Sequence, residues 1–213
     1  MKKELETRAY NFEIRADQED DVKIITGRPI VYNSRTDMGF FDEIIEVGAL
    51  DDADLTDVRF LVNHDRAMIP LARSRRNNGN STMKLTPDFQ GLNIDFIKLD
   101  VENNTTARAL YSAVERGDIS GMSFMFSIDD EEWTDLESNH PTRHIKKIGS
   151  VVEISAVTFP AYESTEIYAR SKDALDSARA AMENARQQNA ATVDTVNNEL
   201  ALLKEKTKIL GGN

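Results

Sequence analysis

The chain has 213 residues, of which 40% are hydrophobic and 30% are charged, and its formal net charge is -11. An acidic chain repels phosphate backbones, so nucleic acid is not expected as a partner, and the lack of cysteine excludes disulfides and cysteine-based zinc sites or nucleophiles. The sequence has neither a signal-peptide pattern nor an apolar run of about 18 residues, so we expect a soluble intracellular protein without membrane contact.

Short β-type runs alternate with turn signals in the first half of the chain. Residues 25–33 (ITGRPIVYN) predict two strands separated by glycine and proline, and residues 40–50 (FFDEIIEVGAL) predict a strand that breaks at Gly48. Residues 57–65 (DVRFLVNHD) predict a short apolar strand with a polar end. Residues 77–99 alternate polar and apolar side chains with a period of two, which is typical of a hairpin with one buried face.

The period changes in residues 103–118, NNTTARALYSAVERGD. The apolar positions follow the spacing of an amphipathic helix, and they are Ala107, Leu110, Tyr111 and Val114. We expect Thr105 or Thr106 to cap the helix and Gly117 to end it in a left-handed conformation.

Two segments rich in β-formers follow, residues 119–128 and 144–159, and proline in FPAY (residues 159–162) closes the second. Together with the earlier runs they predict a mixed, mainly antiparallel sheet or barrel with one helix between strands.

From Ser171 the composition shifts to Ala, Glu, Gln and Lys, with no Gly or Pro before Gly211. Apolar residues recur every three or four positions in two runs, which are Leu175, Ala178, Met182 and Ala185, then Val193, Val196, Leu200 and Leu203. Asn189 interrupts the stripe between the runs, so we expect one long helix or two. The chain is thus divided into a domain of residues 1–170 and a helical tail of residues 171–213, which either packs on its own domain or serves assembly.

Two serines lie where the predicted helix gives way to a strand, in GDISGMSFMF, residues 117–126. Ser123 starts the strand beside small Gly121, where a hydroxyl can stay exposed while its neighbours are buried. Serine is a weak nucleophile unless a base accepts its proton. On this segment alone, the favoured interpretation is that Ser120 or Ser123 merely satisfies backbone groups of the turn.

The sequence has three histidines, and His64 follows the apolar core RFLVN at the polar end of a predicted strand. A neutral imidazole there suits a general base, although it could simply bond Asp65 or a loop carbonyl. His140 and His144 have the spacing HxxxH, but Pro141 breaks the helix that a metal-binding pair needs. No metal or other cofactor is therefore expected.

Glu153 interrupts the apolar strand VVEISAVTF. With a period of two it shares one face with Val151, Ser155 and Val157. A carboxylate among valines is rarely buried unless it is paired, and the acid of a Ser–His–acid triad needs such a place to hold the imidazole. The alternative is an edge-strand glutamate that faces water.

Taken together, these segments resemble the caudoviral prohead serine proteases, which mature the capsids of tailed phages. The resemblance rests on GFFDEIIEVGAL, VRFLVNHDR, ERGDISGMSFMF and VVEISAVTFPAY, in the family's order and at similar intervals from about residue 7 to 170. It implies that Ser123, rather than Ser120, and His64 are the catalytic pair, with Glu153 as the third member. Met125 stands where family members usually have glycine.

The resemblance also implies a fold, because the family is similar to the herpesvirus assembly protease. We therefore expect an α+β fold with a mainly antiparallel, distorted β-barrel, helices around it and a long C-terminal helical tail. The third catalytic residue of the herpesvirus enzyme is a histidine, which keeps His144 as an alternative to Glu153, and Asp65 is another.

The implied function is that of a serine endopeptidase that cleaves capsid and scaffold proteins, and itself, inside the assembling prohead in the host cytoplasm. The expected partners are the major capsid protein with its scaffold segment and a second copy of the chain, with the tail as the recruiting element that self-cleavage removes. The alternative is a non-enzymatic scaffolding protein that keeps the protease fold. A generic serine hydrolase is less favoured, since no G-x-S-x-G elbow is present.

Overall fold

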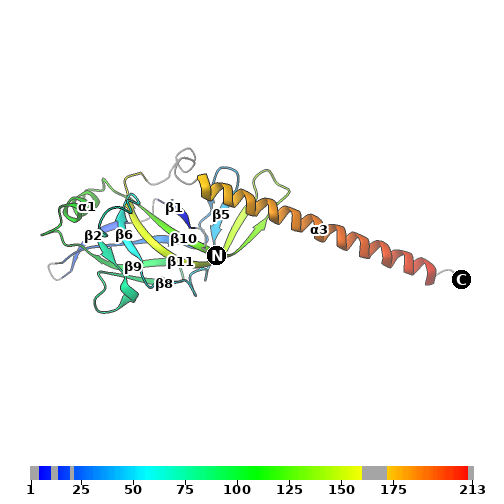
Figure 1. Ribbon diagram of the computed structural model, residues 1–213, viewed down its shortest axis with the longest axis horizontal. Coiled ribbons are helices and arrows are strands. Elements are labelled where there is room, and N and C mark those ends of the chain that lie inside the picture. Colours follow the sequence, from blue (N-terminus) through cyan, green and yellow to red (C-terminus); the bar gives the residue numbers. More distant parts are fainter. Residues whose placement is uncertain (1–4, 11–13, 20–21, 160–171, 211–213) are drawn as a thin grey trace.

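The computed structural model describes residues 5–10, 14–19, 22–159 and 172–210. Within them, strands form two sheets, one helix lies between strands, and a second helix projects from the body (Figure 1). The seven strands of the larger sheet are β1 (Glu6–Tyr10), β4 (Thr36–Asp37), β5 (Asp42–Ile45), β6 (Arg59–Val62), β7 (Ala72–Arg73), β10 (Gly121–Thr134) and β11 (Thr142–Val157). The smaller sheet comprises β2 (Ile14–Glu19), β3 (Val22–Val31), β8 (Met83–Asp88) and β9 (Gly91–Lys98).

The larger sheet is built around the long antiparallel hairpin of β10 and β11. β1 pairs antiparallel with β10, whereas β5 and β6 pair parallel with β11. β5 pairs with residues 142–145 of β11 and β6 with residues 153–156, so the sheet branches along β11. The described strands form two open sheets, and the closed barrel that we expected is not found among them.

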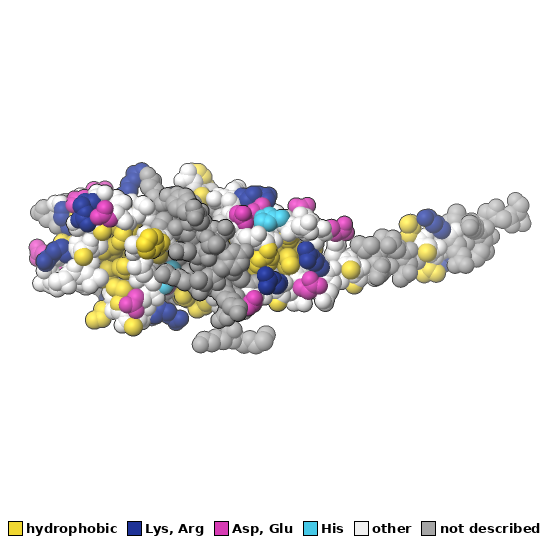
Figure 2. Space-filling model, turned by 90° about the horizontal axis from the view of Figure 1, so that it is seen from above, with side chains coloured by type: hydrophobic (Ala, Val, Ile, Leu, Met, Phe, Trp, Pro, Cys, Tyr) yellow, Lys and Arg dark blue, Asp and Glu magenta, His cyan; other side chains and the backbone are white. Residues whose placement is uncertain are grey.

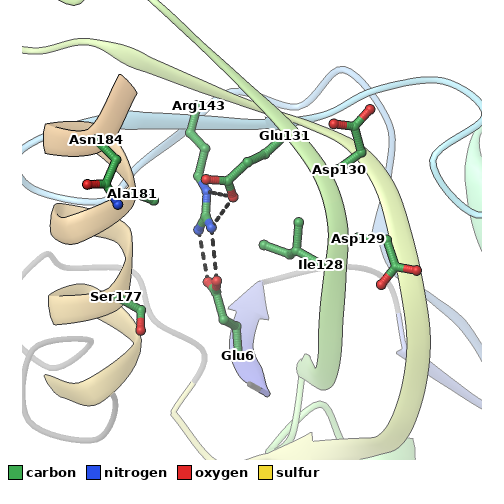
Figure 3. A pocket seen from close by; sticks show the side chains of 9 residues that line it. All are labelled: Glu6, Ile128, Asp129, Asp130, Glu131, Arg143, Ser177, Ala181 and Asn184. Carbon is green, nitrogen blue, oxygen red and sulfur yellow. Dashed lines mark hydrogen bonds and ion pairs between the residues drawn. The ribbon is translucent and has the colours of Figure 1, made fainter. Parts of the chain in front are cut away.

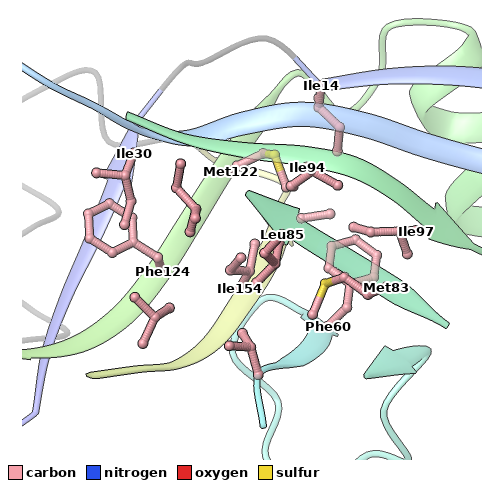
Figure 4. Packing of buried hydrophobic residues seen from close by; sticks show 14 of the residues in the cluster. Ile14, Ile30, Phe60, Met83, Leu85, Ile94, Ile97, Met122, Phe124 and Ile154 are labelled. Carbon is pink, nitrogen blue, oxygen red and sulfur yellow. The ribbon is translucent and has the colours of Figure 1, made fainter. Parts of the chain in front are cut away.

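The hydrophobic core lies between the two sheets (Figure 4). The largest fully buried side chains come from both, and among them are Ile25, Ile30, Phe60, Leu85, Ile94, Phe124 and Phe126. The predicted hairpin of residues 77–99 is confirmed as β8 and β9. Residues 25–33, expected to form two strands, instead lie largely in the single strand β3, whose register shifts on both sides of Gly27 accommodate the glycine and proline.

The predicted helix is α1 (Thr105–Glu115), and its four predicted apolar residues are all buried. Its cap is Asn104 rather than Thr105 or Thr106, because the extended backbone of Asn104 lets its side chain accept from the N–H groups of Thr106 and Ala107. Gly117 follows with φ +78, as predicted for a left-handed stop. A short 3-10 turn (Arg75–Asn77) precedes β8.

The tail forms a single helix, α3 (Lys172–Leu210), of 39 residues. Its beginning packs on the body, where Ala178 and Met182 are buried in a small second cluster with Met38, Phe41 and Trp133. The rest extends away from the body (Figures 1 and 2), and hydrophobic side chains are visible on the projecting part. In the described chain, no helix has the length and apolar character needed to cross a membrane.

Candidate active site

Three strands bring the predicted site residues toward one face of the larger sheet. Ser123 on β10 lies directly opposite Ser155 on β11, and Met125 lies opposite Glu153. On the other side of β11, β6 runs parallel and ends at Val62, two residues before His64. Cross-strand partners point to the same face of a sheet, so Ser123, Ser155 and Glu153 share a face.

His64 and Glu153 are joined by a hydrogen bond of 2.7 Å between Nδ1 and Oε2. Glu153 is almost completely buried, with 5% of its side chain exposed, so the alternative of a water-facing glutamate is wrong. A carboxylate only accepts in such a bond, which assigns the ring proton to Nδ1 and leaves Nε2 free to act as a base. This is the orientation that an acid imposes on the histidine of a Ser–His–acid triad.

The backbone that carries His64 is left-handed at two successive positions, with φ of 51 at Asn63 and 58 at His64. Hydrogen bonds to the end of β11 hold it. The N–H of Asn63 donates to the carbonyl of Ala156 at 2.9 Å, and the Asn63 side chain exchanges two bonds with Thr158. The chain therefore turns sharply after β6.

Ser123 is fully buried, in contrast to the exposed hydroxyl that the sequence suggested. Its Oγ donates to the backbone carbonyl of Arg8 at 2.6 Å, on the neighbouring strand β1. Between Ser123 and His64, both of which the structure describes, no hydrogen bond is formed. The hydroxyl therefore lies on the same face of the sheet as the His64–Glu153 pair, but its hydrogen bond is made to β1.

The alternative site residues occupy other places. His144 bonds Glu46 through Nδ1 at 2.6 Å and Thr134 through Nε2 at 3.1 Å. It precedes Glu153 by nine positions on β11, which corresponds to about 30 Å along a strand. Asp65 accepts from the N–H of Ala67 within its own turn, and Ser120 is exposed before β10.

A buried ion-pair network involves β1, the strand whose Arg8 carbonyl accepts from Ser123, and the sequence did not predict it. Arg8 bonds Glu6 and Glu43, each at 2.5 Å. Arg143 bonds Glu6 at 3.0 Å and also contacts Glu131, as Figure 3 shows. Burial acts to raise the pKa of Glu6, but the two guanidinium groups outweigh it and hold that pKa below its ordinary value. The network anchors β1 against β5, β10 and β11.

A groove of about 550 Å³ lies between the start of α3 and β10, and part of this network lines it. Its walls include Glu6, Asp130 and Arg143 but none of the predicted catalytic residues. Elsewhere, Asp37, Asp42 and His140 bring ligand atoms within 4.8 Å of one another and could hold a cation. Asp42 is already bonded by Arg35 at 2.6 Å and by His140 at 3.1 Å.

The chain matches a known protein family over most of its length. The model of the caudovirus prohead serine protease family matches residues 10–179, which include His64, Ser123 and Glu153. No curated protein and no solved structure matches the chain. The matched range ends within the part of α3 that packs on the body, so the projecting part of the helix lies outside it.

Proposed function

Because the chain belongs to the caudovirus prohead serine protease family and is therefore a serine peptidase, we propose that Ser123, His64 and Glu153 are its catalytic triad and that it cleaves capsid and scaffold proteins, and its own chain, inside the prohead. The observation that carries the triad is the bond between His64 and the buried carboxylate of Glu153, on the face of the sheet that Ser123 shares. The experiment that tests it is cleavage of the cognate capsid protein by the wild type and by site variants.

In the proposed reaction, the Ser123 oxygen attacks the scissile carbonyl carbon while Nε2 of His64 takes the hydroxyl proton. The tetrahedral intermediate collapses, the peptide C–N bond breaks, and His64 returns the proton to the leaving amine. A water molecule then attacks the acyl-enzyme in the same way. His64 takes the proton of the water and returns it to the Ser123 oxygen as the acyl product leaves. Glu153 stays ionised and stabilises the imidazolium that forms in each half.

The reaction requires the hydroxyl of Ser123 to leave the carbonyl of Arg8. A rotation about χ1 of Ser123 changes the bond partner without moving the strand, because staggered rotamers place Oγ in different directions from the same backbone. We propose that the bond to Arg8 belongs to a resting arrangement and that the bond to Nε2 of His64 forms when substrate is present.

Replacing Glu153 with glutamine should lower kcat by about 10⁴-fold while the fold is kept, because an amide can present its N–H₂ to Nδ1 and favour the wrong tautomer. The rate of capsid-protein cleavage and the far-UV circular dichroism of both proteins are the measurements. A variant that cleaves at the wild-type rate would move the acid's role to another residue. Glu46→Gln, which changes the partner of His144, is the matched control.

We also propose that the projecting part of α3 recruits the enzyme by binding the scaffold segment of the capsid protein. Leu200 and Leu203 lie on the apolar stripe and are 48% and 60% exposed. A helix with so thin a stripe gains stability when a partner covers it. The first part of α3 has a different role, since Ala178 and Met182 complete the second cluster of the body.

Ending the chain after Asn189 should leave the fold and peptidase activity unchanged but reduce packaging into proheads. Ending it after Arg170 is not equivalent, because that would also uncover Met38 and Trp133. Quantifying the enzyme in isolated proheads is the measurement. Leu200→Glu should reproduce the defect, while Leu202→Glu, exposed but off the stripe, should not. Packaging of the shortened chain at the wild-type level would exclude recruitment by this segment.

A further inference from the structure

Ser155 joins His64 to Glu153 a second time. It follows Glu153 by two positions on β11 and is fully buried. Its Oγ accepts from the backbone N–H of His64 at 3.1 Å, and its hydroxyl donates to Oε1 of Glu153. The other carboxylate oxygen bonds the ring of His64. The three residues therefore form a closed circuit of hydrogen bonds, with Ser155 between the backbone of one partner and the carboxylate of the other.

The backbone bond acts where the chain is strained. A left-handed conformation is unfavourable for a residue with a Cβ, and Asn63 and His64 adopt it in succession. Such residues persist when their surroundings hold them. The N–H of Asn63 donates to the carbonyl of Ala156 on β11, whereas the N–H of His64 donates to the side-chain hydroxyl of Ser155. That bond secures the turn that brings the imidazole to Glu153.

The carboxylate bond acts on the other partner. Glu153 is buried, and a buried carboxylate with one oxygen unpaired carries a large desolvation penalty. With Oε1 held by Ser155, Oε2 is directed to Nδ1 of His64. Position 155 thus needs one atom that both accepts and donates, which a hydroxyl provides and a methyl group does not.

We propose that Ser155 is a positioning residue of this peptidase, which fixes the backbone of His64 and the carboxylate of Glu153 so that Nε2 faces the nucleophile. The inference rests on the proposed triad. Ser155 lies opposite Ser123, but its hydroxyl bonds the His64 backbone and the Glu153 carboxylate instead of a reacting atom. It contributes by keeping the base in its productive orientation. A shift of about 1 Å in such a group can lower a rate by about 10²-fold.

An alkyl fluorophosphonate, which phosphonylates an activated serine with loss of fluoride, tests the inference without a known cleavage sequence. In the full-length chain, Ser155→Ala should lower the maximal labelling rate of Ser123 by about 10–100-fold and leave the probe's half-saturating concentration unchanged. Ser155→Thr keeps the hydroxyl and should restore most of the rate. Ser127→Ala is the matched control. It removes a buried hydroxyl from the same hairpin, and among the described residues that hydroxyl bonds only Ser150.

A second comparison separates positioning from stability. Ser155→Ala added to Glu153→Gln should change the labelling rate little further, because both substitutions disturb one circuit. If the fold-losses in labelling rate of the two single variants multiply in the double variant, the inference is overturned. Equal labelling rates of the wild type and Ser155→Ala would overturn it as well. Failure of the wild type to label at Ser123 would instead count against the proposed triad itself.

Discussion

Ser123→Ala should abolish cleavage of the capsid protein, with a loss of about 10⁴-fold or more in kcat. The substitution removes the attacking oxygen, and the remaining machinery cannot form an acyl-enzyme. Since the side chain is buried and bonded only to the carbonyl of Arg8 among the contacts described, its loss should lower the free energy of unfolding by about 1 kcal/mol. Gel-based cleavage and thermal unfolding of the same preparations measure the two effects.

The matched control is Ser120→Ala. Ser120 is exposed and lies three positions earlier, so its loss should leave both cleavage and stability unchanged. His64→Ala should match Ser123→Ala, because a triad without its base loses about as much as one without its nucleophile. Cleavage by Ser123→Ala at the wild-type rate would contradict the assignment of Ser123 as the nucleophile.

Arg143→Met should produce the largest loss of stability, about 3–5 kcal/mol, with a fall in Tm of about 6–20 °C. Arg143 is 3% exposed in its side chain and bonds Glu6 and Glu43, which are also buried. Removing the guanidinium leaves buried carboxylates without one of their partners. Urea unfolding at neutral pH is the measurement. Arg116→Met, which breaks an exposed pair with Asp118, should change stability by less than about 1 kcal/mol.

The difference between wild type and Arg143→Met should shrink in acid. The folded-state pKa of Glu6 lies below its ordinary value of 4.5 because Arg8 and Arg143 outweigh the effect of burial. A carboxyl group with a lowered pKa contributes stability above that ordinary value, and the contribution is lost as the pH falls through the folded-state pKa. A loss that equals the one in Arg116→Met, or that grows in acid, would contradict the assigned role of the network.

The sequence predicted those features that depend on neighbours in the chain. The face of α1, the hairpin β8–β9 and the helical tail follow from local periodicity, and the period of two on β11 put Glu153 and Ser155 on one face. The role of Ser155 could not be predicted in this way. It depends on where β6 ends beside β11 and on the backbone N–H of His64, which only the tertiary structure brings to the hydroxyl.

The buried network and the branched sheet escaped prediction for a related reason. Glu6, Glu43 and Arg143 stand in segments whose charge suggests exposure, and no local pattern indicates that they meet. Likewise, β5 and β6 pair with different halves of β11, which lies far from both in the sequence, so no local pattern predicts the pairing. The bond that holds the Ser123 hydroxyl is also long-range, because the Arg8 carbonyl that accepts it lies 115 positions earlier in the chain.

The distances along the chain set the order in which the nascent protein can assemble. Glu153 is made 89 residues after His64, an interval of roughly 4–18 s at the usual rates of translation. The interval is longer for Glu6, because its partner Arg143 is made 137 residues later. A contact between such distant residues cannot form before the later of the two has been made. The proposed triad is therefore incomplete on the ribosome until β11 has emerged, by which time β10 and β9, the partners of β1 and β3, have already been made.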